Sequence, residues 1–117
     1  MKNSVLKNKS FDFGVKIVMY CHQLKSEKKE YVLYKQLLRS GTAIGALIRE
    51  GEFGQSRADF INKMSIALKE ANETDYWLDL LKSSKYLSDE QYSDMSSKLK
   101  DILYMLIATI KTAKGNK

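Results

Sequence analysis

The stretch RSGTAIGALIREGEFG, residues 39–54, decides how the chain folds, because it holds four of the six glycines in a sequence that has no proline. Two interpretations compete for it. A glycine-rich segment can form a loop that holds a phosphate group, or a helix whose missing side chains admit a neighbouring element. The two interpretations lead to different functions, and the surrounding residues separate them.

The phosphate-loop interpretation lacks the residues it needs. No strand precedes the segment, no Gly-Lys-Ser/Thr ends it, and it contains no G-x-G-x-x-G. On a helix, Gly41 and Gly45 fall within the apolar stripe of the segment. A glycine inside a helix costs about 1 kcal/mol relative to alanine, so we interpret both as positions of close packing. We expect Gly51 and Gly54 to form the C-cap and turn of the following link.

Apolar residues recur at three- and four-residue spacing along the chain, which is typical of helices. Ser10, Ser56 and Ser88 are the expected N-caps, and Ser88 begins the capping box Ser-Asp-Glu-Gln. We expect four helices, over residues 11–26, 30–53, 57–84 and 89–113. Because the links are short, residues 1–117 are predicted to form a single domain, an all-α antiparallel up-down-up-down four-helix bundle.

The first expected helix carries more apolar residues than one bundle core needs. Phe13 and Ile17 belong to one ridge, and Phe11, Val15 and Val18 form another. We therefore expect this helix to face another subunit as well as its own core.

The composition favours a cytoplasmic protein. With 117 residues, 44% of them hydrophobic, the chain can bury a modest core. The first ten residues, MKNSVLKNKS, lack the apolar stretch of a signal peptide, and the run ILYMLIATI at 102–110 is shorter than the ~20 residues of a membrane-spanning helix. We expect no membrane association. The lone Cys21 excludes an internal disulfide and a multi-cysteine zinc site.

Few residues suit catalysis or metal binding. Cys21 and His22 are adjacent, so on a helix their side chains diverge by about 100° and form neither a nucleophile–base pair nor a joint metal site. The Glu-x-x-His pairs of di-iron bundles are missing. Glu70 and Glu73 could act as paired carboxylates, but we favour a salt bridge from Glu70 to a basic residue such as Arg39. We therefore predict a non-enzyme without catalytic residues, cofactor or metal.

The net charge of +6 and the pI of about 9.3 point to a basic surface. In a bundle, the tails and the second link lie at one end, which collects more basic residues than the other end. The residues proposed to contact nucleic acid there are Lys7, Lys9, Arg49, Arg57, Lys111 and Lys114, with Lys2 and Lys117 beside them. Such an end is typical of a phosphate-contact surface and equally of a solubilising surface, and both interpretations remain open. Tyr76 and Trp77 suit a stacking platform for bases, but more often such residues are core or interface.

The sequence resembles a known family in three segments, LYKQLLRSGTAIGALIREG (33–51), SRADFINKMSIALKEANETDYWLDLL (56–81) and KLKDILYMLIATIKTAK (98–114). They are similar to the bacterial four-helix-bundle proteins named for intervening sequences of 23S ribosomal RNA genes. The resemblance covers residues 11–114. It implies a protomer that assembles into a ring, a homopentamer in related members, and it implies no catalytic residues. A relative of that family, the accessory variability protein of diversity-generating retroelements, is a basic pentamer that works with a reverse transcriptase and nucleic acid.

The resemblance also assigns a buried polar network. Arg39, Ser40, Glu70 and Glu73 match the family at positions that would form it, whereas Leu47 stands where the family usually has asparagine.

Our leading hypothesis is a non-enzymatic oligomer that binds RNA or another nucleic acid through its basic end. The alternative is a protein-interaction scaffold or accessory subunit that makes no direct contact with nucleic acid.

Overall fold

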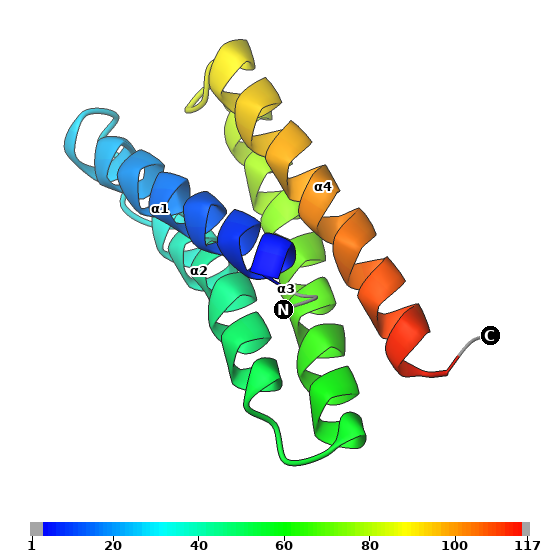
Figure 1. The fold of residues 1–117 in the computed structure, drawn as a ribbon. Coiled ribbons are helices and arrows are strands. Elements are labelled where there is room, and N and C mark those ends of the chain that lie inside the picture. The colour runs from blue at the N-terminus through cyan, green and yellow to red at the C-terminus, as the bar shows by residue number, and fades with distance from the viewer. Residues whose placement is uncertain (1–3, 116–117) are drawn as a thin grey trace.

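The structure, a computed structural model, describes residues 4–115, and these contain four helices in an antiparallel bundle (Figure 1). The helices are α1 (Ser4–Ser26), α2 (Leu33–Glu52), α3 (Arg57–Ser83) and α4 (Asp89–Ala113). Each helix packs against its two neighbours in the ring order α1, α2, α3, α4 and back to α1. The bundle measures 47 × 22 × 20 Å. The predicted all-α four-helix bundle is confirmed.

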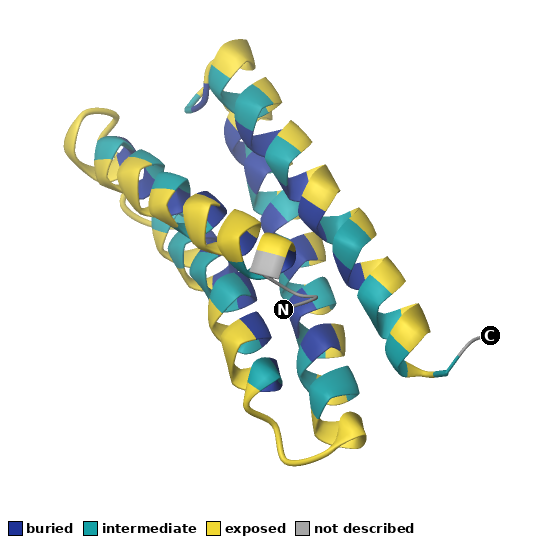
Figure 2. Cartoon of the chain, viewed as in Figure 1, coloured by how far each residue is buried: buried dark blue, intermediate teal, exposed yellow. Residues whose placement is uncertain are grey.

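One apolar stripe from each helix forms the core, and Figure 2 shows these buried residues along the inner sides of the helices. Ile17, Ile44, Met64 and Leu99, one from each helix, are each 0% exposed. Burial of these side chains is the main favourable contribution to folding. None of the four helices is long and apolar enough to cross a membrane.

Two helices begin where the sequence predicts. Ser56 Oγ accepts a hydrogen bond from the Asp59 backbone N–H at 3.0 Å and caps α3. Ser88 forms a full capping box with Gln91, in which each side chain bonds the backbone N–H of the other. These caps satisfy backbone donors that the first helical turn leaves without partners.

The predicted start of α1 at Ser10 is wrong, since the helix begins at Ser4. Ser10 lies inside it, 1% exposed, and its hydroxyl donates to the Lys7 carbonyl oxygen at 3.0 Å. The reason is tertiary packing. Leu6 lies seven residues before Phe13 on the same face and is equally buried, so the core extends about two turns beyond Phe13 toward the N-terminus.

The second helix begins at Leu33 rather than Glu30. Glu30 is 6% exposed, and its carboxylate accepts hydrogen bonds from the backbone N–H groups of Val32, Leu33 and Tyr34. Glu30, which was predicted to be helical, therefore precedes the helix and caps its N-terminus. The helix ends at Glu52, one residue before the predicted end.

The glycines of α2 face two different helices. A Cβ added at Gly41 would lie 2.8 Å from Ile17 Cγ1, and one at Gly45 would lie 3.3 Å from the Ser10 carbonyl oxygen. Both glycines thus allow α1 to approach closely. Gly51 was expected in the turn but lies inside α2, buried against α3, so only Gly54 belongs to the link.

Candidate nucleic-acid interface

Two of the predicted phosphate-contacting lysines lie on α1 and are engaged by carboxylates. Lys7 Nζ is 3.6 Å from Glu52 Oε1, and Lys9 Nζ is 3.6 Å from Asp101 Oδ2. The Glu52 side chain is only 5% exposed, so Lys7 compensates a buried negative charge. Both lysines therefore take part in contacts between helices.

Three other cations gather where α3 begins and α4 ends. Arg57 is the first residue of α3, Lys111 lies in the last turn of α4, and Lys114 is its C-cap. All three are exposed. A Cβ added to Gly115, the residue after Lys114, would lie 4.0 Å from Arg57 Nη1. The start of α3 and the end of α4 are therefore neighbours. We call these three residues the α3–α4 basic end. Lys2 and Lys117 lie outside the described residues.

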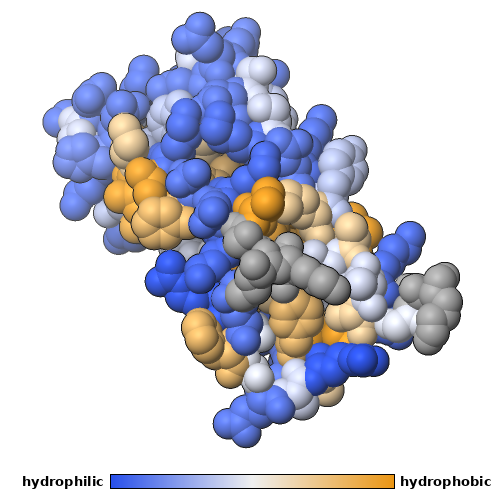
Figure 3. All heavy atoms as spheres, in the orientation of Figure 1, coloured by the Kyte–Doolittle hydropathy of each residue, from blue (hydrophilic) through white to orange (hydrophobic). Residues whose placement is uncertain are grey.

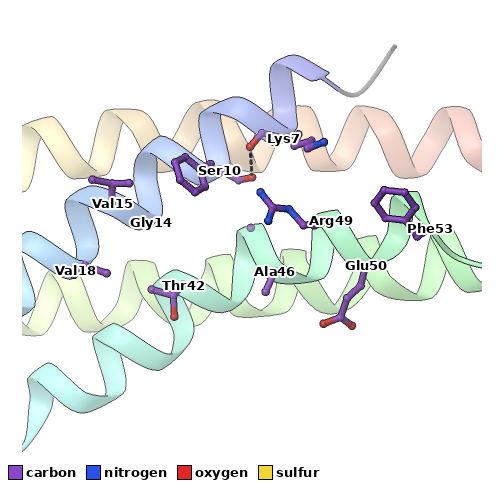
Figure 4. A pocket seen from close by; sticks show the side chains of 12 residues that line it. Lys7, Ser10, Gly14, Val15, Val18, Thr42, Ala46, Arg49, Glu50 and Phe53 are labelled. Atoms are coloured by element: carbon purple, nitrogen blue, oxygen red, sulfur yellow. Dashed lines mark hydrogen bonds between the residues drawn. The ribbon is translucent and has the colours of Figure 1, made fainter.

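Arg49, the sixth predicted cation, lies apart from that end, in a groove between α1 and α2. The α1–α2 groove has a volume of about 760 Å³. Its apolar wall includes Phe11, Val15 and Val18 of α1, which are 57%, 44% and 51% exposed. Figure 4 shows Arg49 reaching from α2 toward α1 beside Phe53, and Figure 3 shows apolar side chains gathered over these two helices.

The polar residues that match the family lie between α2 and α3. The Arg39 guanidinium donates to Glu70 Oε1 at 3.0 Å and also to Glu73. Glu73 Oε2 accepts a second hydrogen bond, from Trp77 Nε1 at 3.2 Å. Both carboxylates are therefore bound by donors, as a salt-bridge role requires. Arg39 is half exposed, so this cluster lies near the surface rather than deep in the core.

Beneath the Arg39 cluster, Thr74 donates to Ser40 at 2.9 Å, and both side chains are fully buried. Leu47 is half-buried and packs against the core. Tyr76 and Trp77 contact each other edge to face, with ring centroids 5.2 Å apart.

The thiol of Cys21 is unsuited to nucleophilic chemistry. It is 2% exposed, and its Sγ donates to the Tyr34 carbonyl oxygen at 3.4 Å. Burial, together with the nearby charge of Glu30, raises the pKa of this thiol to about 12, so it stays protonated at neutral pH. Across residues 4–115, no group of three His, Cys, Asp or Glu side chains is placed to hold a metal ion.

An ion-pair seam joins α1 to α4, and the sequence reasoning missed it. Lys16 Nζ lies 2.7 Å from Asp94 Oδ2, and Lys98 Nζ lies 2.6 Å from Asp94 Oδ1. Hydrogen bonds from Lys16 and then Lys98 lower the pKa of Asp94. Lys9 and Lys16 are seven residues apart, as are Asp94 and Asp101, so each pair lies on one helix face, but this spacing does not show which faces pack together.

The ring of four antiparallel helices, the glycine contacts of α1 with α2 and the Arg39 cluster define a four-helix-bundle protein with a specific polar link between α2 and α3. The family described as 23S rRNA-intervening sequence protein matches residues 2–108, and the chain belongs to this family. The resemblance seen in the sequence is thereby confirmed.

One solved structure is similar over almost the whole chain. It is described as a protein with unknown function from the S23 ribosomal protein family, from Bacteroides thetaiotaomicron VPI-5482. It is 55% identical, covers 95% of this chain and 99% of its own, and has a TM-score of 0.93. No curated protein matches the chain.

Proposed function

We propose that this protein is a non-enzymatic oligomer of the cytoplasm that binds RNA through the α3–α4 basic end. The observation that carries the proposal is the proximity of Arg57 to the end of α4, which brings three exposed cations together. The description of the family by 23S rRNA supports RNA as the polyanion. Hydrogen bonds within the bundle already hold the side chains of Glu70, Glu73 and Cys21, and this supports a role without catalysis.

Such an end binds phosphates by charge. Each lysine or arginine that neutralises a phosphate releases a condensed counterion, so the affinity falls as salt rises. Three cations per protomer give weak binding, and several protomers in one assembly multiply it, because binding at one copy raises the effective concentration at the next. No base-specific contact is required.

The assembly we propose is a homopentameric ring in which another copy covers the α1–α2 groove. The support is the exposed ridge of Phe11, Val15 and Val18, which a single protomer leaves in contact with water. Large exposed apolar patches mark interaction surfaces in soluble proteins.

The test of RNA binding uses a labelled stem–loop RNA and fluorescence anisotropy at salt concentrations from about 50 to about 200 mM. We expect wild-type affinity to fall steeply over this range. The double variant Lys111→Glu/Lys114→Glu should bind more weakly, with a salt slope reduced by about two, one for each lost phosphate contact. Lys28→Glu/Lys35→Glu makes the same charge change at the opposite end of the bundle and should have a smaller effect.

Absence of binding at low salt, or binding that salt does not change, would contradict the proposal.

A protein-interaction scaffold is the second candidate, and the α1–α2 groove favours it, because apolar grooves between helices accept amphipathic helices. Capture from the native host separates the two candidates. RNA should copurify if the first is right, and one stoichiometric protein without RNA should copurify if the second is right.

A further inference from the structure

On α4, the acidic residues after the first turn and Lys100 lie on different sides of the helix. After its first turn its acidic residues are Asp94 and Asp101, and both face α1, where they bind lysines of that helix. Lys100 faces the other way and lines a shallow polar groove together with Lys82 of α3. Asp94 and Asp101 are thus engaged at the α1 seam, where Lys98 also binds Asp94, whereas Lys100 lies toward the α3 side.

An exposed aromatic residue lies among these basic residues. Tyr104 is 69% exposed. At about 100° per residue, Lys100, Tyr104 and Lys111 point within about 40° of one another on the helix surface. Lys114 continues the row to the end of α4, where Arg57 of α3 joins it. We call Lys100, Tyr104, Lys111 and Lys114 the α4 outer stripe. At 1.5 Å per residue the stripe is about 21 Å long.

Two acidic residues of α3, Asp75 and Asp79, lie near the Lys100 end of the stripe. Asp79 accepts a hydrogen bond from Tyr92 at 2.6 Å, and the Asp75 carboxylate interacts with the Lys100 charge. Both acidic residues lie at the Lys100 end, away from Arg57.

We infer that the α4 outer stripe is a track for single-stranded RNA, on which Tyr104 stacks against an unpaired base while Lys100, Lys111 and Lys114 hold phosphates. This inference rests on the proposed function and adds the kind of RNA and the residues that recognise it. An exposed aromatic ring cannot reach bases that are already stacked within a duplex, whereas an unpaired base offers its face. A track of this kind is tolerant of sequence because every base has such a face.

The position of the stripe is compatible with assembly. Around one bundle the helices follow the order α1, α2, α3, α4, so the α3–α4 edge is opposite the α1–α2 edge. A ring joins two different surfaces of each protomer, so the inference requires the surface that fills the neighbouring α1–α2 groove to lie outside the α4 outer stripe. Repetition around a ring would present several stripes to one RNA strand.

The test measures binding of labelled oligo(U) and of a duplex RNA of the same length by fluorescence anisotropy. Tyr104→Ala should weaken oligo(U) binding by roughly 5- to 100-fold, the usual loss for one stacked base, and should change duplex binding much less. Tyr104→Trp should retain the affinity. Lys100→Ala should weaken both RNAs. Tyr31→Ala and Lys35→Ala are the matched controls, since both residues are exposed at the far end of the bundle, and neither should matter.

A spectroscopic measurement reports stacking directly. In a Trp77→Phe background, Tyr104→Trp supplies the only tryptophan of the chain, and oligo(U) should quench its fluorescence. Circular dichroism confirms that each variant is folded. If wild-type protein binds oligo(U) but Tyr104→Ala binds equally well and the new tryptophan is not quenched, the stripe inference fails and the proposed function stands. If the wild type binds neither RNA, both fail.

Discussion

Gly45 controls how closely α1 can approach α2. The Ser10 carbonyl oxygen lies 3.3 Å from the place of an added Cβ, and this oxygen belongs to helix backbone that cannot move alone. We predict that Gly45→Leu lowers the free energy of unfolding by about 1–3 kcal/mol, the usual cost of overpacking, as measured by urea denaturation. The gain in helix propensity offsets only part of that loss.

Gly14 provides the matched control, because an added Cβ there has no atom within 4 Å. Gly14→Ala should leave stability unchanged or raise it by up to about 1 kcal/mol. If Gly45→Leu unfolds at the same urea concentration as the wild type, the close approach of α1 is not what requires this glycine.

At the scale of elements, the α1–α4 seam depends on the charge of Asp94. The pKa of Asp94 is lowered by hydrogen bonds from Lys16 and Lys98, and the pKa of Lys16 is raised, chiefly by Asp94. A lowered carboxyl pKa gives stability that is present above the ordinary value of 3.8 and is lost as the pH falls through the folded-state pKa. The raised lysine pKa gives stability below 10.5, which is lost at higher pH.

We therefore predict that thermal stability of the wild type declines more steeply below about pH 4 than that of Asp94→Asn. Between pH 5 and 9 the variant should be less stable by at most about 1 kcal/mol, because the seam is near the surface and water screens it. High salt should reduce the difference. Parallel pH profiles of the two proteins would show that the seam contributes nothing.

Helix caps could be predicted from the sequence, whereas contacts between helices could not. Ser56 and Ser88 were predictable as caps because a cap bonds residues three positions away. The start of α1 was not, since Leu6 is buried by other helices. The partners of Lys7 and Lys9 also depend on how far one helix is shifted along another, and local spacing does not contain that shift.

The contacts of the candidate site could be predicted only in part. Arg39, Glu70 and Glu73 were assigned together because they match a family pattern, and the structure places them in contact. The six cations proposed to contact nucleic acid were grouped only because the chain topology brings the two tails and the second link to one end of the bundle. Arg49 lies in the α1–α2 groove because its position on α2 turns it toward α1, and topology does not give that rotation.

At the scale of the whole molecule, the bundle presents two opposite edges with different chemistry. The α1–α2 edge is an apolar groove, and the α3–α4 edge carries exposed cations with Tyr104 among them. In a ring each protomer contributes two different surfaces, so we expect the second assembly surface to lie outside the exposed cations of the α3–α4 edge. Loss of RNA binding would leave assembly intact, whereas loss of assembly would also weaken RNA binding because fewer basic ends would act together.

The assembly itself gives the last prediction. Val15→Lys/Val18→Lys places two charges on the wall of the α1–α2 groove, whose lining already includes Lys7 and Arg49, and a second copy could cover them only by removing these charges from water. By light scattering, the wild type should have about five times the 13.4 kDa protomer mass, and the variant should approach a single protomer with its helicity unchanged. Met19→Lys/His22→Lys puts the same charges on exposed α1 positions outside the groove and should leave the mass as it was. A wild-type mass of one protomer, or an assembly that tolerates lysines in the groove, would show that another copy does not cover this edge.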